Sequence, residues 1–104
     1  MRAGRLDVSR QLPEEQARRL AVRIVREGRT VFTKHCRREM ADDGLLETDV
    51  VNTIAGGLIT EPGEISLRGG WRYRVRTRRI TVVIEFRSHE EMVIVTAWRE
   101  SRSE

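Results

Sequence analysis

The chain has 104 residues, 35% of them charged and 38% hydrophobic, and a formal net charge of +4. This length fits one domain with a core that needs no disulfide or metal. No apolar run reaches the roughly 20 residues of a membrane span or resembles a signal peptide, so we expect a cytoplasmic protein without a membrane partner. The single cysteine, Cys36, excludes an intramolecular disulfide, and no Cys/His spacing predicts a metal site or a cofactor.

Three helices are predicted in the first part of the chain. Residues 1–11 show no usable periodicity and are expected to form a flexible arm. A first helix begins at Pro13 and ends at Gly28. The apolar residues that recur at helical spacing between them are Ala17, Leu20, Ala21, Ile24 and Val25. A second, short helix has Thr33 as its N-cap, and a third has Thr48 as its N-cap.

Beyond the third helix the apolar period changes to two, which predicts strands. Short extended segments are expected at 58–60 and 65–67, and strong strands at 71–75, 80–86 and 92–98, joined as antiparallel hairpins. The fold class is therefore α+β, with N-terminal helices packed on one face of an antiparallel sheet of about four strands. The single domain 1–104 divides into an arm (1–11), a helical part (12–57), a sheet (58–99) and a tail (100–104).

The register between the strands predicts which residues share a face of the sheet. The expected pairs are Trp71 with Ile84, Tyr73 with Val82, Val75 with Ile80, Ile84 with Ile94, and Phe86 with Met92. These residues form the core face, so both Trp71 and Tyr73 are expected to be core residues. The same register places Arg72, Arg74 and Arg76 on the opposite face. Their expected neighbours there are Thr81, Val83, Glu85, Val93, Val95, Ala97 and Arg99.

Charge is distributed unevenly along the chain. Residues 39–67 hold seven acids and no Lys or Arg, whereas residues 68–79 hold six arginines and no acid. Two interpretations stay open: the two blocks pair with each other, or the arginines present a positive surface to an anionic ligand. Three consecutive outward arginines on one strand favour the second, because a planar guanidinium grips phosphate through two hydrogen bonds and stacks on bases. RNA is the expected ligand.

His35 is the candidate for chemistry on such a ligand. It lies in the first turn of the second helix, where free backbone N–H groups favour a bound phosphate. Cleavage of RNA without a metal needs a base for the 2′-hydroxyl, an acid for the leaving oxygen and cations for the phosphate. Lys34, Arg37 and Arg38 stand beside His35 to supply such parts. The alternative is a solvated surface histidine on a charged helix.

Several segments of the chain resemble a known family. They are the run from Phe32 to Met40 (FTKHCRREM), Gly44-Leu45, Asp49-Val50, the run from Gly70 to Val75 (GWRYRV), the run from Ile80 to Phe86 (ITVVIEF), and the run from Val93 to Arg99 (VIVTAWR). Together they resemble a small family related to the MqsR and RelE toxins, whose wider fold is shared with barnase and several colicins. The resemblance covers roughly residues 31–99. It implies N-terminal helices on a four-stranded antiparallel sheet whose other face binds RNA.

The resemblance also implies a function and site residues. The family's helix histidine corresponds to His35, the arginine after it to Arg37, its sheet arginine to Arg72, and its closing motif to Thr96, Ala97, Trp98 and Arg99. Glu39 stands where the family often has an arginine. The implied protein is the toxin of a type II toxin–antitoxin system, a metal-independent endoribonuclease (mRNA interferase) held inactive by an antitoxin encoded beside it.

The sequence thus leads to one hypothesis and one alternative. In the first, the protein cleaves mRNA, and its partners are RNA and the antitoxin, in a homodimer or a toxin–antitoxin complex. The expected catalytic residues are His35, Arg37, Arg72 and Arg99, and the expected RNA-binding residues are Lys34, Arg38, Arg74, Arg76, Thr96 and Trp98. In the alternative, the same surface belongs to a non-catalytic module that binds RNA or protein.

Overall fold

The structure, a computed structural model, describes residues 6–100, so the predictions for residues 1–5 and 101–104 lie outside it. Its elements are α1 (Glu14–Glu27), β1 (Arg29–Phe32), α2 (Lys34–Asp42), α3 (Glu47–Gly56), β2 (Glu64–Ile65), β3 (Trp71–Arg76), β4 (Ile80–Phe86) and β5 (Glu91–Arg99). The strands form one sheet in the order β1-β5-β4-β3-β2. The α+β layout of helices on a sheet is confirmed. The purely antiparallel sheet of about four strands is wrong, because β1 is a fifth strand that pairs in parallel with β5.

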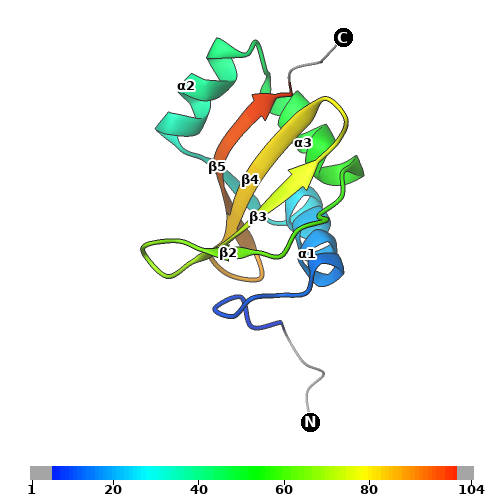
Figure 1. Ribbon diagram of the computed structural model, residues 1–104, viewed down its shortest axis with the longest axis vertical. Coiled ribbons are helices and arrows are strands. Elements are labelled where there is room, and N and C mark those ends of the chain that lie inside the picture. The colour runs from blue at the N-terminus through cyan, green and yellow to red at the C-terminus, as the bar shows by residue number, and fades with distance from the viewer. Residues whose placement is uncertain (1–5, 101–104) are drawn as a thin grey trace.

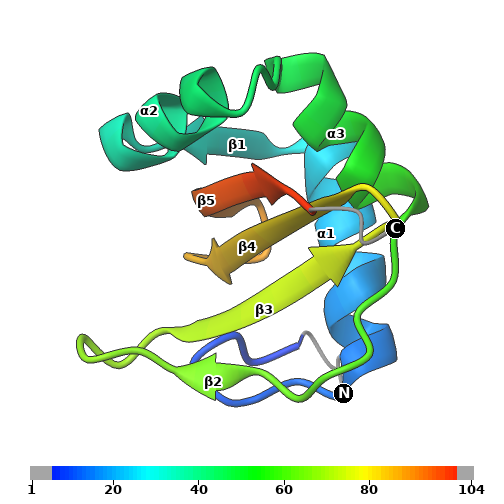
Figure 2. The same ribbon diagram turned by 45° about the horizontal axis from the view of Figure 1, so that its top comes forward.

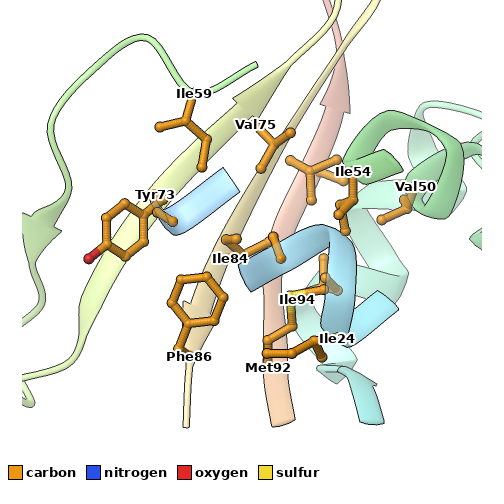
Figure 3. Close-up of a cluster of buried hydrophobic side chains, with 14 of the residues drawn as sticks. Ile24, Val50, Ile54, Ile59, Tyr73, Val75, Ile84, Phe86, Met92 and Ile94 are labelled. Atoms are coloured by element: carbon orange, nitrogen blue, oxygen red, sulfur yellow. The ribbon is translucent and has the colours of Figure 1, made fainter. Parts of the chain in front are cut away.

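The helices α1 and α3 lie on one face of the sheet and leave the other face open (Figures 1 and 2). The core fills the space between these helices and the sheet. Figure 3 shows Ile24 of α1 and Ile54 of α3 meeting Ile84 and Ile94 of the central strands, and all four are buried. We call the face turned away from α1 and α3 the open face.

The register of the sheet differs from the predicted one in two ways. Between β3 and β4, Tyr73 pairs with Ile84 and Val75 with Val82, two residues away from the expected partners. A shift by an even number keeps every side chain on its face, so Arg72, Arg74 and Arg76 do lie on the open face. Trp71 and Tyr73 lie on the core face as expected, Trp71 partly buried and Tyr73 fully buried.

The second difference is a bulge between β4 and β5. Ile84 pairs with Ile94 as predicted, but Val83 pairs with Thr96, so that Val95 has no opposite residue. The extra residue inverts the faces of the rest of β5. Ala97 pairs with Val82 and is buried in the core, whereas the predicted register had placed it on the open face. Thr96 and Trp98 take the open face instead.

The helix ends follow local hydrogen bonds. The side chain of Thr33 accepts a hydrogen bond of 2.9 Å from the backbone N–H of Cys36, which confirms it as the N-cap of α2. The predicted cap of the third helix is wrong, since α3 begins one residue before Thr48. There the carboxylate of Asp49 accepts from the backbone N–H of Leu46 at 2.8 Å.

Residues 6–11 are the described part of the segment for which the sequence predicts a flexible arm, and they pack against the sheet. Leu6 and Val8 are partly buried against the core. Four hydrogen bonds connect the segment and the residue after it to the rest of the chain. Trp71 Nε1 donates to the Ser9 carbonyl at 3.1 Å, Gln11 Nε2 to the Gly63 carbonyl at 2.8 Å, and the Leu12 N–H to the Tyr73 hydroxyl at 2.8 Å. The fourth joins Nε2 of His89 and the Leu6 carbonyl. The segment runs beside β2 and β3 in Figure 2.

Cys36 is buried in the core on α2, and burial raises the pKa of its thiol to about 11. A protonated, buried thiol acts as a small apolar side chain. Within residues 6–100, no group of three or more His, Cys, Asp or Glu side chains is placed to hold a metal ion. No helix in the same range is long and apolar enough to cross a membrane.

Candidate nucleic-acid interface

A groove of ≈ 610 Å³ lies on the open face of the sheet. Its floor comes from β3, β4 and β5, and residues 61–68, which include β2, form a wall. The floor residues are Arg72, Arg74, Val83, Val95, Thr96 and Trp98, and the wall contributes Ile65, Leu67 and Arg68 among others. The structure therefore brings together four predicted site residues, Arg72, Arg74, Thr96 and Trp98.

The lining of the groove holds three arginines and two acids, Glu61 and Glu64, so its positive charge is balanced in part. The Nε of Arg72 lies 2.9 Å from Oε1 of Glu85, its neighbour across β4. Arg74 is exposed and has no carboxylate within ion-pair distance among residues 6–100, and the same holds for Arg68. Arg74 and Arg68 are thus available for an anion, whereas Arg72 already shares its charge.

Apolar surface lies beside this charge. Ile65 and Leu67 are exposed on the wall of the groove, although isoleucine and leucine are among the residues most often buried in proteins. Trp98 is half-buried on the floor, and its indole Nε1 donates a 3.1 Å hydrogen bond to the carboxylate of Glu100. The buried hydroxyl of Thr81 donates to the same carboxylate, which fixes the position of Glu100 beside the indole. An anion bound here would meet both guanidinium groups and apolar surface.

Arg99 lies outside the groove, contrary to its predicted place on the open face. The bulge in β5 turns it to the other side of the sheet, where it pairs with Ile80. Its backbone N–H donates to Oδ2 of Asp43 at 2.7 Å, its Nε to the Asp43 carbonyl at 3.2 Å, and its Nη2 to the Gly44 carbonyl at 3.3 Å. Arg99 therefore ties the end of β5 to the residues that follow α2.

Replacing Arg99 with alanine should therefore affect stability more than ligand binding. The loss of two side-chain hydrogen bonds to backbone carbonyls is expected to lower the free energy of unfolding by about 1 kcal/mol. Affinity for RNA should fall no further than in Arg26→Ala, which removes an exposed charge from α1. Chemical denaturation and RNA titration of the two variants measure both effects. Unchanged stability together with lost RNA binding would restore Arg99 to the site.

The four predicted residues of α2 do not line the groove. Lys34, His35, Arg37 and Arg38 are exposed on this helix, which lies beside β5 (Figure 1). Arg37 is engaged locally, with its guanidinium 5.2 Å from the ring centre of Phe32 and its Nη1 2.5 Å from Glu47. The structure thus does not bring His35 and Arg37 together with Arg72.

One contact nevertheless connects the start of α2 with the groove. The hydroxyl of Thr33, directly before Lys34, lies 3.4 Å from the carbonyl of Val95, a residue of the groove floor. The first turn of α2 therefore begins beside the floor.

The remaining predicted residue, Arg76, lines a neighbouring depression and pairs with Glu61 at 3.3 Å. Within residues 6–100, Glu61 and Arg76 form the one ion pair between the acidic block (39–67) and the arginine-rich block (68–79). The sequence-based selection missed Ile65, Leu67 and Arg68, whose segment carries no strong strand pattern. The position of Arg68 at the start of the arginine-rich segment was the one feature of the sequence that could have indicated this part of the groove.

Residues 32–99 match the family described as a domain of unknown function, DUF4258. The chain belongs to this family. The matched DUF4258 region begins at the last residue of β1 and ends with β5, so it contains α2, α3 and the whole groove. The search of curated proteins and that of solved structures found no match.

Proposed function

We propose that this DUF4258 protein binds single-stranded RNA in the groove of the open face. The observation that carries the proposal is the presence of Arg68, Arg72 and Arg74 in one groove with exposed apolar side chains. Arginine binds phosphate, and aromatic or apolar side chains cover the faces of unstacked bases. Neither feature alone would indicate nucleic acid.

The apolar wall favours a single strand over a duplex. A duplex hides its base faces and presents phosphates and sugars, which would leave Ile65 and Leu67 without a counterpart. The volume of ≈ 610 Å³ falls within the range of about 300–1,000 Å³ typical of pockets that hold small organic ligands. A groove of this size accommodates bases of a short segment.

The test is titration of a fluorescent twelve-nucleotide RNA at several salt concentrations. Each phosphate contact on a single strand contributes about −0.7 to the slope of log K against log salt, so the three groove arginines contribute about −2 to that slope. A duplex of the same sequence should bind more weakly. Absence of binding even at low salt would refute the proposal.

A second candidate function is RNA cleavage by a toxin of a toxin–antitoxin system, with an antitoxin as partner and the cytoplasm as its place of action. The position of Thr33 beside Val95 favours it, because His35 follows within the first turn of α2. In this proposal the strand is held by the groove arginines and its backbone continues past the start of α2. There His35 takes the proton of a 2′-hydroxyl, and Lys34 and Arg38 beside it stabilise the charge on the phosphate. The resemblance to MqsR and RelE supports the same chemistry.

Cleavage is tested with labelled RNA in the presence of a chelator. The products expected from 2′-hydroxyl attack end in a 2′,3′-cyclic phosphate, and His35→Ala should reduce cleavage at least a hundredfold without changing RNA affinity. Expression should arrest growth, and the neighbouring gene product should relieve the arrest. If RNA stays intact with the wild-type protein, only the binding function remains.

A further inference from the structure

A second depression, of ≈ 540 Å³, lies where β3 turns into β4. Its lining includes Arg76, Arg78 and Arg79, together with Gly56 at the end of α3 and the exposed Leu58. Three arginines thus line a small concave surface. The side chains of Arg78 and Arg79 have no carboxylate within ion-pair distance among the residues that the structure describes.

Arg76 has weak partners in this depression. Its Nε is buried and has no hydrogen-bond acceptor within the described part of the chain. Its Nη2 lies 3.3 and 3.4 Å from the two carboxylate oxygens of Glu61, longer than the 2.7–2.9 Å of a strong charge-assisted hydrogen bond. Glu61 is itself exposed, so water screens the pair. An incoming anion with several acceptor oxygens would be a better partner for Arg76 than Glu61.

We infer that this depression is a second phosphate-binding site for the RNA strand that occupies the groove. The inference rests on the proposed function and extends it to a longer ligand. Arg72, Arg74 and Arg76 follow one another on the open face of β3, and Arg76 leads from the groove into the depression. From Arg72 to Arg76 the strand spans four steps of about 3.4 Å, or about 14 Å. A stacked strand rises about 3.4 Å per nucleotide, and an unstacked strand rises more, so about four nucleotides or fewer cover that span.

Glu61 competes with the phosphate for Arg76. It borders both depressions, since it lines the groove and pairs with Arg76. A phosphate that binds Arg76 displaces the Glu61 carboxylate. Rotation of the Arg76 guanidinium then allows its Nε–H to donate to a phosphate oxygen. A neutral residue at position 61 should consequently favour RNA.

The experiment compares RNAs of three and twelve nucleotides. The double variant Arg78→Ala/Arg79→Ala should bind the twelve-nucleotide RNA about tenfold more weakly, with a salt dependence about 1.4 shallower in log–log slope. It should bind the trinucleotide as the wild-type protein does, measured by NMR titration, because the groove alone holds that ligand. Glu61→Gln should bind the longer RNA severalfold more tightly.

The control is Arg19→Ala/Arg26→Ala, which removes the same charge from exposed positions of α1, across the sheet from the groove. If both double variants bind the twelve-nucleotide RNA equally well, the second site is wrong while the groove stands. If the wild-type protein binds neither RNA, the proposed function fails and the second site fails with it. Equal loss for the trinucleotide and the longer RNA would also overturn the second site.

Discussion

Replacing Arg74 with glutamate is expected to weaken binding of single-stranded RNA by more than tenfold. Arg74 lies in the groove, is exposed, and has no carboxylate within ion-pair distance among residues 6–100. A hydrogen bond between charged groups contributes about 1.5–3 kcal/mol, and each 1.4 kcal/mol corresponds to a factor of ten in affinity. The introduced carboxylate adds repulsion of the phosphates. Titration with the twelve-nucleotide RNA at physiological salt measures the effect.

Arg74 gives a cleaner test than its neighbour Arg72. Removal of Arg72 would leave the partly buried Glu85 without its ion-pair partner, so that changes in binding and in stability would be mixed. Arg26→Glu on α1 is the matched control, since it makes the same change of charge on an exposed helix. If Arg74→Glu and the control lose the same small amount of affinity, RNA binds elsewhere or through net charge alone.

Replacing Gly57 with alanine is expected to lower the free energy of unfolding by about 1–3 kcal/mol, the usual cost of overpacking. An added Cβ would lie 2.6 Å from the Thr53 carbonyl oxygen, 2.8 Å from that of Arg76 and 2.9 Å from Cγ1 of Val75. Two of these neighbours are backbone atoms of α3 and β3, which cannot move aside without shifting both elements. For a domain of this size each kcal/mol lowers the melting temperature by about 4–8 °C. Thermal and chemical denaturation measure the loss.

Gly56→Ala is the natural control, because it makes the same change one residue earlier. Apart from its two chain neighbours and the backbone of its own helix, no atom lies within 4 Å of a Cβ built at Gly56, which ends α3. Alanine there should be neutral or stabilise by about 0.5–1 kcal/mol, because it restricts the unfolded chain. Equal stabilities of the two variants would contradict the close contact between the end of α3 and β3. That contact also fixes the backbone at Arg76, which bridges to Leu58.

The face of the arginines was predictable from the sequence, although their partners in β4 were not. Alternation along residues 71–76 determines the face, and it survives a register error of two residues. The position of the β3–β4 turn along the chain determines the register, and the arginine-rich residues 76–79 have no pattern that reveals where the turn is centred. The prediction paired Val75 with Ile80, whereas Arg76 pairs with Thr81.

The position of Arg99 was not predictable by alternation. The pattern of residues 92–98 indicates one uninterrupted strand, and no Gly or Pro in it marks the bulge at Val95. The bulge decides whether the end of β5 contributes Arg99 or Trp98 to the open face. β1 was not predicted either, because the sequence of a four-residue strand does not reveal which distant strand it pairs with in parallel.

The wall of the groove could not be predicted from the sequence either. Ile65 and Leu67 are exposed apolar residues in a segment with a two-residue strand, and nothing in their spacing places them opposite Trp98. The separation of α2 from the groove is equally a matter of tertiary packing. His35 and Arg72 stand 37 positions apart in the sequence, and resemblance alone had placed them in one site.

The most direct test of RNA binding in the groove is an NMR titration of the isotope-labelled protein with the twelve-nucleotide RNA. Backbone and arginine Nε resonances report every position at once, without substitution. We predict changes at Arg68, Arg72 and Arg74, at Thr96 and at the indole of Trp98, with little change on α1. Changes that cluster on α1, or a spectrum that RNA leaves unaltered at low salt, would contradict RNA binding in the groove.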